Sequence, residues 1–388
     1  MGKAKLCCAV VFGGKSVEHE ISILTAMQII SSIDRTKYDV IAVMQTKDCE
    51  FVISEDFNSL QSFRQQAHKT KRVLFYAKGN KVYLKRIFGP KSIEIDVVLL
   101  SVHGKGVEDG NLYGYFKSLG CPVTSCDCLV ASVFQNKLIT KKLLASENIS
   151  VLPYYLVTED DWKKNKKDIL SDLNGLDYPQ IVKAINQGSS IGIYHASNPD
   201  EAVGAIIKAL RYDTEVILEN CLVNYREFNQ AILASPLTLS LIEEVKTNNS
   251  FLTFEDKYQS NSLKRIINPE LDEVLANKIS QITKKIHLKF NTKSVVRIDY
   301  MYDCDKEQLY VNEVNTIPGS LAFYLFEDLG IEFSELIDYI LTAAIKNHYD
   351  EEQKISTFVS NVLKTSSINH KWCLIRGFLF WKSYWRKW

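Results

Sequence analysis

The chain of 388 residues lacks an excess of charge of either sign. Its 47 Lys and Arg residues are balanced by 46 Asp and Glu residues, which gives a formal net charge of +1. Nucleic-acid partners select concentrated positive charge, so this balance gives no general reason to expect one. The chain also lacks a run of about 20 apolar residues, the length that a membrane-spanning helix requires. A membrane-spanning protein is therefore not expected.

Paired cysteines with metal-ligand spacing are also lacking, although the chain has nine cysteines. The closest group, Cys121, Cys126 and Cys128, has no nearby His and no second CxxC, which favours free thiols over zinc. The early apolar stretch "LCCAVVFGG" is too short for a signal peptide, and position 6 lacks the Ser or Thr of a myristoylation signal. We therefore expect a cytoplasmic protein with reduced cysteines.

Two common nucleotide-binding motifs are missing as well. The first glycine-containing loop reads "GGKSVE" rather than GxGxxG, which argues against a nicotinamide-dependent dehydrogenase. The later segment "QGSSIG", Gln187 to Gly192, is not followed by Gly-Lys-Ser/Thr, so it is not a P-loop. Its glycines and serines still suit a loop that covers phosphate groups.

Hydrophobic patterns predict an α/β fold. Apolar strands at 5–14 and 38–46 and a longer one at 93–104 alternate with helices at 21–33 and 110–120, which indicates a parallel sheet. Residues 71–87 alternate around Gly79-Asn80 and predict a hairpin. Further along, one amphipathic helix is expected over 132–149, a helix over about 269–289, and a functional loop in the polar segment 244–262.

Two later strands carry the polar side chains that a metal–nucleotide complex needs. In "VVRIDYMYD" the residues Arg297 and Asp299 share one face, and in "YVNEVN" the residues Glu313 and Asn315 do the same. Carboxylate and amide oxygens suit Mg²⁺ together with nucleotide phosphates. A salt-bridged hairpin is the alternative. Lys183, within the apolar strand that precedes the Gly/Ser loop, is a candidate phosphate ligand because buried lysines need a partner.

A family resemblance joins these motifs. In this order, "FGGKSVEHEIS", "HGKGVEDG", "KAINQGSSIG", "FEDKY", "VRIDYM" and "NEVNTIPG" resemble the D-alanine–D-alanine ligase family of ATP-grasp enzymes. The resemblance implies a Rossmann-like domain followed by a two-subdomain ATP-grasp fold of α+β type. The expected divisions are an N-terminal domain at 1–130, a small subdomain at 131–217, a large subdomain at 218–350 with a mobile loop at 244–262, and a helical tail at 351–388.

The resemblance implies that the cofactors are ATP and two ions of Mg²⁺ (or Mn²⁺). It also implies roles for individual residues. Glu18 holds the ammonium of the first amino acid, while Arg297 and the Gly319 N–H stabilise an oxyanion. The expected nucleotide-binding residues are Lys137, Lys183, Ser189, Ser190, Glu219, Glu227 and Lys257. The expected metal ligands are Asp299, Glu313 and Asn315. Ser189 and Tyr258 link Glu18 to the phosphate-covering loop, and the remaining expected substrate contacts are His103, Tyr324 and Leu325.

One departure from the family pattern leaves the second substrate open. After "NTIPG" the family usually has a segment ending in Ser-His-Ser, but this chain has Ala322-Phe323-Tyr324. D-Alanine, D-serine and another amino acid of secondary metabolism all stay open as acceptors, and an inactive nucleotide-binding homologue is a further alternative. The family also implies a homodimer formed through the N-terminal domain.

The end of the chain has an unusual composition. Four of the five tryptophans lie at or after Trp372, between lysines and arginines. This composition suits a segment that lies at a membrane interface. A docked terminal helix and a non-native end of the sequence are the alternatives.

Overall fold

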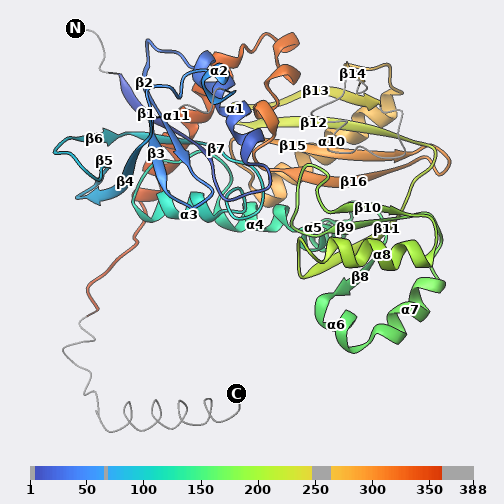
Figure 1. Ribbon diagram of the computed structural model, residues 1–388. Helices are drawn as coiled ribbons and strands as arrows, with labels where there is room; N and C mark the ends of the chain where they lie inside the picture. The colour runs from blue at the N-terminus through green and yellow to red at the C-terminus, as the bar shows by residue number, and fades with distance from the viewer. Residues whose placement is uncertain (1–4, 65–68, 247–263, 361–388) are drawn as a thin grey trace, which may run out of the picture. The chain divides into compact units, whose positions relative to one another are not determined.

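A computed structural model describes residues 5–64, 69–246 and 264–360 (Figure 1). The chain divides into one unit of Met1–His348 and a second of Tyr349–Trp388. The first unit contains three β-sheets. In the second unit, the last helix of the described residues ends at Glu352 and residues 353–360 are not helical, so the prediction of a helical tail is wrong for 353–360. The tryptophan-rich end lies outside the described residues.

The first sheet has seven strands in the order β6-β5-β4-β3-β2-β1-β7. These strands are β1 (Leu6–Gly13), β2 (Tyr38–Gln45), β3 (Phe51–Ile53), β4 (Lys71–Lys78), β5 (Lys81–Arg86), β6 (Ser92–Ile95) and β7 (Val97–Ser101). Strand β1, which lies between β2 and β7, is parallel to both, as the sequence predicts, and its apolar run is buried from Cys8 onward. The other pairings are antiparallel, so the α/β class is confirmed but the sheet is mixed.

One strand predicted in this sheet is two strands. The residues from 93 onward divide at Asp96, whose carboxylate accepts a hydrogen bond from the Cys7 N–H at 2.7 Å. This bond fixes the bend between β6, which pairs with β5, and β7, which pairs with β1. The predicted hairpin around Gly79-Asn80 is confirmed as β4 and β5. Strand β3 was not predicted.

Helices cover this sheet and close its hydrophobic core. They are α1 (His19–Ser32), α2 (Leu60–Arg64), α3 (Asn111–Ser118) and α11 (Phe333–Glu352). Phe12 of β1, Ile29 of α1, Phe116 of α3 and Ile337 of α11 are all completely buried in one cluster. Residues from both ends of the first unit therefore share a core.

The second sheet is antiparallel, with the strand order β10-β9-β11-β8. Its strands are β8 (Tyr154–Thr158), β9 (Gln180–Ala184), β10 (Ile193–Ala196) and β11 (Glu215–Asn220), accompanied by α6 (Glu159–Lys164), α7 (Lys166–Asn174) and α8 (Pro199–Ala209). Helix α8 begins where the sequence indicates, because the Asn198 side chain accepts a hydrogen bond from the Glu201 N–H and Pro199 occupies the first turn.

The third sheet is also antiparallel, in the order β14-β13-β12-β15-β16, and α10 packs against it. Its elements are β12 (Tyr225–Ala234), β13 (Leu237–Lys246), β14 (Lys264–Ile267), α10 (Glu273–Phe290), β15 (Val295–Asp303) and β16 (Gln308–Asn315). The predicted loop at 244–262 begins too early, because 244–246 continue β13. After the residues outside the description, the chain resumes with β14, which follows the end of the predicted loop. Lys257 and Tyr258 lie outside the described residues.

The helix predicted over 132–149 is two helices, α4 (Cys128–Gln135) and α5 (Lys137–Ser146). Asn136 separates them in an extended conformation, with φ −94° and ψ 106°. Its side chain accepts a hydrogen bond from the Ile139 N–H at 2.9 Å and so caps α5. This break places Lys137 at the first position of α5, beside the second sheet.

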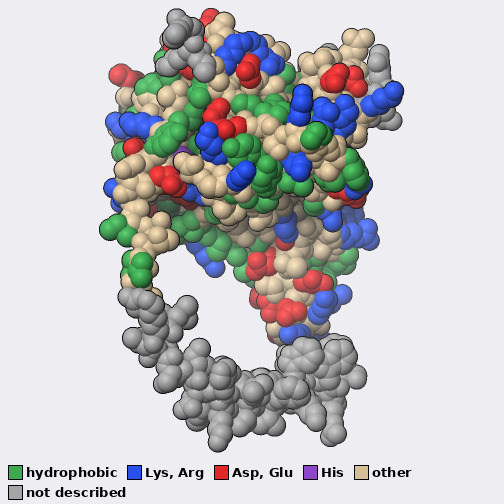
Figure 2. Space-filling view, turned by 90° about the vertical axis from the view of Figure 1, so that its left-hand side faces the viewer, with side chains coloured by type: hydrophobic (Ala, Val, Ile, Leu, Met, Phe, Trp, Pro, Cys, Tyr) green, Lys and Arg blue, Asp and Glu red, His purple; other side chains and the backbone are tan. Residues whose placement is uncertain are grey.

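The surface carries both signs of charge. Figure 2 shows basic and acidic side chains interspersed on the face that it presents. Among the helices of the described part of the chain, none has the length and apolar character needed to cross a membrane.

Candidate active site

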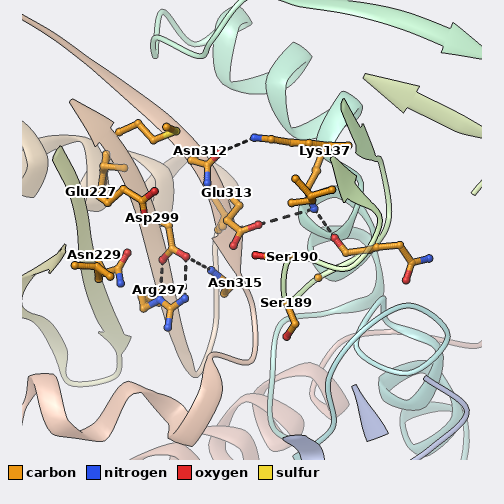
Figure 3. A pocket seen from close by; sticks show the side chains of 18 of the residues that line it. Lys137, Ser189, Ser190, Glu227, Asn229, Arg297, Asp299, Asn312, Glu313 and Asn315 are labelled. Carbon is orange, nitrogen blue, oxygen red and sulfur yellow. Dashed lines mark hydrogen bonds and ion pairs between the residues drawn. The ribbon is translucent and has the colours of Figure 1, made fainter. Parts of the chain in front are cut away.

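One cavity, with a volume of about 420 Å³, is lined by side chains of the second and third sheets and by residues beside the first sheet, such as Glu18 before α1 and His103 after β7 (Figure 3). Most of the residues predicted from the sequence border it. They are Glu18, His103, Lys137, Lys183, Ser189, Ser190, Glu219, Glu227, Arg297, Asp299, Glu313, Asn315, Gly319 and Tyr324. Leu325 is the exception among the described ones, because its side chain is completely buried in the core of the first sheet.

A row of polar side chains crosses the third sheet, and every member of it except the buried Glu243 lines this cavity. Glu243 of β13, Asn229 of β12, Asp299 of β15 and Glu313 of β16 lie directly opposite one another on neighbouring strands. We call these four residues the polar row. Register alone brings them together, since residues opposite each other in a sheet share a face.

Arg297 and Asp299 form the strongest ion pair of this face. The Arg297 Nε and Nη2 atoms donate to the two carboxylate oxygens of Asp299 at 2.7 and 2.8 Å. Asn315 donates to the same carboxylate at 3.1 Å. Burial acts to lower the pKa of Arg297, but Asp299 outweighs it and holds the pKa well above its usual value. The salt-bridged hairpin, the alternative to a metal site, is therefore present on the face that also carries the predicted metal ligands.

The oxygen atoms here fit a hard divalent cation. Asp299 and Glu313 supply carboxylates, and Asn312 and Asn315 supply amides beside them. No group of three His, Cys, Asp or Glu side chains is placed to hold a metal ion by itself within the described residues. An ion bound here would therefore need further ligands, and Mg²⁺ usually takes them from nucleotide phosphates and water.

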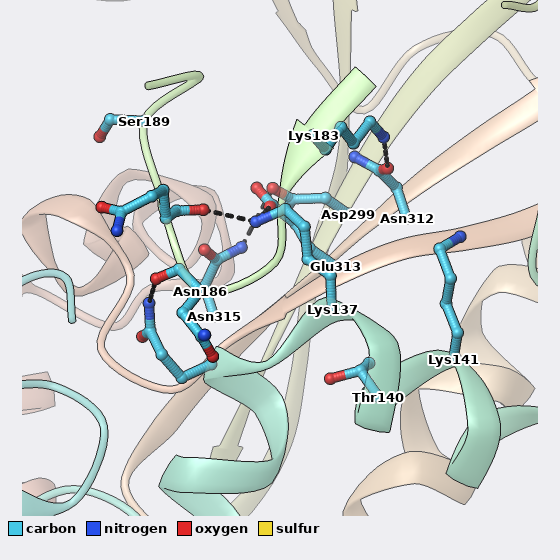
Figure 4. A network of polar contacts seen from close by, with 12 residues as sticks. Lys137, Thr140, Lys141, Lys183, Asn186, Ser189, Asp299, Asn312, Glu313 and Asn315 are labelled. Atoms are coloured by element: carbon cyan, nitrogen blue, oxygen red, sulfur yellow. Dashed lines mark hydrogen bonds and ion pairs between the residues drawn. The ribbon is translucent and has the colours of Figure 1, made fainter. Parts of the chain in front are cut away.

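Opposite this face, Lys183 of β9 is part of a buried network (Figure 4). Its Nζ donates to Glu219 at 2.7 Å and to Asn312 at 3.2 Å, and Lys141 contacts the other Glu219 oxygen at 2.8 Å. Burial acts to raise the pKa of Glu219, but Lys183 and Lys141 outweigh it and lower that pKa to about 2. Glu219, expected to contact a nucleotide, thus holds two lysines in place.

Lys137 reaches the same space from the first turn of α5. Its Nζ donates to the Gln187 carbonyl and lies 3.9 Å from a Glu313 oxygen. The side chain is only 11% exposed, and burial lowers the pKa of its ammonium group, opposed by Glu313. Lys137 is therefore a site residue and not a solvated helix lysine.

The Gly/Ser loop contacts the first domain through Glu18. The Ser189 hydroxyl donates to the Glu18 carboxylate, which is the contact expected from the sequence. Ser189 and Ser190 have φ of 49° and 59°, a left-handed backbone that side chains disfavour. A Cβ atom on Gly188 would lie 2.6 Å from a Glu18 oxygen, so a larger residue there would displace the Glu18 carboxylate.

A second group of contacts shapes the segment after Pro318. Glu108 accepts hydrogen bonds from the N–H groups of Gly104 and Ile317, at 3.0 and 3.1 Å, and so orders the glycine-rich loop at 103–110. His103 Nε2 lies 3.0 Å from the Thr25 hydroxyl, whose oxygen accepts from the Ser320 N–H at 3.2 Å. His103 therefore supports the turn through Thr25.

That turn is left-handed. Ser320, Leu321 and Ala322 have φ of 53°, 52° and 51° within the short helix η1 (Gly319–Leu325). It is followed by η2 (Glu327–Leu329). The Ser320 hydroxyl also donates to Gln28 of α1 at 2.6 Å, which adds a second anchor. Helix α1 thus determines the path of the segment that carries Tyr324.

We expect His103 to make stability depend on pH. The side chain is 4% exposed, and burial lowers its pKa to about 4. Below pH about 6.5 the unfolded chain binds a proton that the folded protein takes up only near pH 4. As the pH falls from about 6.5 to about 4, the free energy of unfolding should decrease by up to about 3 kcal/mol more in the wild type than in His103→Gln. Urea unfolding across this range measures the difference, and equal slopes would contradict the assignment.

Several site residues were not predicted. Lys141 looks like an ordinary helix lysine in the sequence, but it is 2% exposed and paired with Glu219. Glu243 and Arg265 fall at the two ends of the polar segment, where no periodic signal marks them. Asn229 is recognised as a site residue only from the strand pairing, which places it opposite both Glu243 and Asp299.

The cavity therefore has two chemically different walls. Lysines approach from the second sheet and α5, and carboxylates with an arginine line the third sheet. Such a pair of antiparallel sheets can hold a triphosphate between cations and a metal ion. Fold and site together define an ATP-grasp ligase, and solved ligases of this class share the fold.

Comparison with known proteins gives the family. Its models match residues 7–126 (D-ala D-ala ligase N-terminus) and 143–342 (D-ala D-ala ligase C-terminus). The chain belongs to the D-alanine–D-alanine ligase family. It is 36% identical over 366 residues to the D-alanine–D-alanine ligase of Thermosipho melanesiensis, covering 92% of this chain and 97% of that one. The relative from Caldicellulosiruptor bescii is 33% identical, covering 91% and 99%.

Solved structures agree in fold. The D-alanine–D-alanine ligase of Coxiella burnetii superimposes with a TM-score of 0.77 at 23% identity, covering 90% of this chain and 97% of that chain. The VanG D-Ala:D-Ser ligase of Enterococcus faecalis gives a TM-score of 0.73 at 26% identity, covering 88% and 100%.

Proposed function

We propose that this protein joins two molecules of D-alanine at the expense of ATP, forming the dipeptide used in peptidoglycan synthesis. One observation carries the proposal: Lys137 and Lys183 approach the cavity from one wall, and Asp299 and Glu313 from the other. Family membership supports it, and the fold is that of the ligases already named.

The proposed reaction has two steps. The carboxylate of the first D-alanine attacks the terminal phosphorus of ATP, so that a C–O–P linkage forms and ADP leaves. The amine of the second D-alanine then attacks the acyl phosphate. A C–N bond forms, the C–O bond to phosphate breaks, and the amine gives up a proton.

The residues of this chain would divide the work as follows. Lys137 and Lys183 would hold the phosphates, with Ser189 and Ser190 covering them and Glu227 at the ribose. Asp299, Glu313 and Asn315 would hold Mg²⁺ or Mn²⁺, as two ions, and the ions would neutralise the charge of the phosphates. Glu18 would hold the ammonium of the first D-alanine.

The oxyanion of the second step needs its own donors. Arg297 and the N–H of Gly319 line the same part of the cavity and would supply them. Preorganised donors of this kind are each worth about 3 kcal/mol in other enzymes. His103, bonded to Thr25, would act as a support of this segment and not as a proton donor.

A different acceptor is the second candidate. It is favoured by one observation: the Tyr324 hydroxyl is bonded to Arg265 and Glu243 at 2.8 and 3.1 Å, so the acceptor end differs from the family's serine. D-Serine is one acceptor to test, since a D-Ala:D-Ser ligase has the same fold. A larger amino acid of secondary metabolism is another.

We further propose a cytoplasmic homodimer. The cysteines of the described part of the chain are free thiols, as expected in a reducing compartment. On the first sheet, Leu74, Ile87, Phe88 and Ile93 of the β4–β6 region are exposed, and Phe88 is 86% exposed. Such apolar exposure favours contact with a second copy, which light scattering can test.

The test of the function is ADP release with ATP and Mg²⁺ across single and paired D- and L-amino acids, with products identified by mass. Release with D-alanine alone and formation of its dipeptide is the expected result. Release only with a second amino acid would establish the alternative acceptor. ATP binding without ADP release for any amino acid would reject the ligase assignment.

A further inference from the structure

The acceptor end of the cavity contains a three-residue cluster that resemblance to the family does not explain. Arg265 of β14 lies opposite Val245, and Glu243 is two residues away on the same face of β13. The Arg265 Nη1 atom donates to Glu243 at 3.1 Å and to the Tyr324 hydroxyl at 2.8 Å. The guanidinium also lies 5.5 Å from the centre of the Tyr324 ring. Each member thus fixes the others.

Tyr324 cannot serve as a substitute for a serine in this arrangement. A phenol has one proton, and the Tyr324 proton is donated to Glu243 at 3.1 Å. Its oxygen in turn accepts from Arg265. Burial raises the pKa of Tyr324 to about 12, opposed by Arg297, so the phenol stays protonated. Its hydroxyl therefore has no proton left for a substrate carboxylate.

Arg297 and Arg265 differ in which edge of the guanidinium group forms hydrogen bonds. Arg297 uses its Nε and Nη2 atoms, the fork that matches a carboxylate, for Asp299. Arg265 contacts its partners among the described residues through Nη1 alone. Its side chain is 43% exposed and lines the cavity. The Nε–Nη2 edge of Arg265 is thus the one available for a second carboxylate.

We infer that Arg265 recognises the carboxylate of the acceptor amino acid, and that Glu243 and Tyr324 position it for this role. The inference rests on the proposed function and names a specificity-determining group for it. A bidentate guanidinium–carboxylate contact would hold the acceptor while its amine attacks. Asn229, the neighbour of Glu243 in the polar row, donates to it at 2.8 Å and so connects the cluster to the rest of that row.

A competition experiment tests this directly. Each enzyme receives ATP, Mg²⁺ and equal concentrations of D-alanine and D-alaninamide, which lacks the acceptor carboxylate. The ratio of dipeptide to dipeptide amide, measured by mass spectrometry, compares the two acceptors independently of the amount of active enzyme. We expect Arg265→Met to lower this ratio about ten- to a hundredfold, the loss of a charge-assisted hydrogen bond. Arg265→Lys should restore part of it.

The matched control is Arg226→Met. Arg226 of β12 forms a bidentate pair with Glu244 of β13 at 2.7 and 3.0 Å, but neither residue lines the cavity. The ratio of dipeptide to dipeptide amide should be the same for Arg226→Met as for the wild type. Tyr324→Phe should lower the ratio less than Arg265→Met, because Glu243 still holds the arginine.

The outcomes separate the two proposals. Failure of the wild type to make either product would reject the joining of two D-alanines, and the absence of ADP release with every paired amino acid as well would reject the ligase assignment. Products from the wild type with an unchanged ratio in Arg265→Met would overturn the inference. A change only in the choice between D-alanine and D-serine would assign Arg265 to the acceptor side chain and overturn it as well. If Arg265→Met is inactive, the ratio in Arg265→Lys decides.

Discussion

Glu313→Gln should lower ADP release about a thousandfold while leaving the fold intact. Glu313 lies opposite Asp299 on neighbouring strands, and its side chain is 24% exposed toward the cavity. Glutamine keeps the shape but removes the charge that would hold a divalent ion, and such an ion contributes several kcal/mol to phosphoryl transfer. Steady-state ADP release at saturating ATP measures the effect.

Two further measurements make this result specific. Binding of Mn²⁺ with ADP, followed by electron paramagnetic resonance, should weaken in Glu313→Gln, whereas the thermal unfolding midpoint should not change. Glu327→Gln, on the exposed surface of η2, is the control and should behave as the wild type. Normal turnover in Glu313→Gln would remove this residue from the metal site.

Glu219→Gln should lower the free energy of unfolding by about 3–5 kcal/mol, the usual cost of removing one partner from a buried ionic network. The Glu219 carboxylate is 1% exposed and lies within 2.8 Å of two lysine ammonium groups. Those lysines are 2% and 9% exposed, so neither can turn to water easily. Urea unfolding at neutral pH measures the loss.

The pH dependence and a double variant distinguish this cause from simple loss of packing. A buried lysine without its partner can lose its proton, so the destabilisation should shrink as pH rises from about 7 toward 10. Adding Lys141→Met removes one of the two unpaired charges and should recover part of the stability. A loss below about 1 kcal/mol, or one independent of pH, would show that the network contributes little.

The third sheet's chemistry could be predicted because alternation is a local signal. Arg297, Asp299, Glu313 and Asn315 stand two apart within apolar strands, and the hairpin of β15 and β16 pairs them as expected. The fold class followed from the order of strands and helices. The sequence did not predict where two elements are interrupted. Asp96 divides a strand and Asn136 divides a helix, and each does so through a side-chain hydrogen bond that hydrophobic periodicity does not reveal.

The rest of the site depends on contacts between residues distant in sequence. Lys141 acquires its role from Glu219, and Glu18 from Ser189, because packing brings separate sheets to one cavity. Tyr324 was recognised as a departure, but its effect depends on Arg265 and Glu243, which no local pattern marks. Sequence therefore marked the residues proposed for phosphate and metal better than those proposed for the acceptor.

The left-handed turn after Pro318 has a consequence for exchanging parts between related enzymes. Three successive residues with a Cβ adopt a conformation that costs about 1–2 kcal/mol each, and Thr25 and Gln28 near the start of the chain hold them there. The proposed acceptor site is therefore shaped by residues from the two ends of the first unit. A chimera that carries only the C-terminal half into a relative would lose these anchors, and with them the setting of the second substrate site.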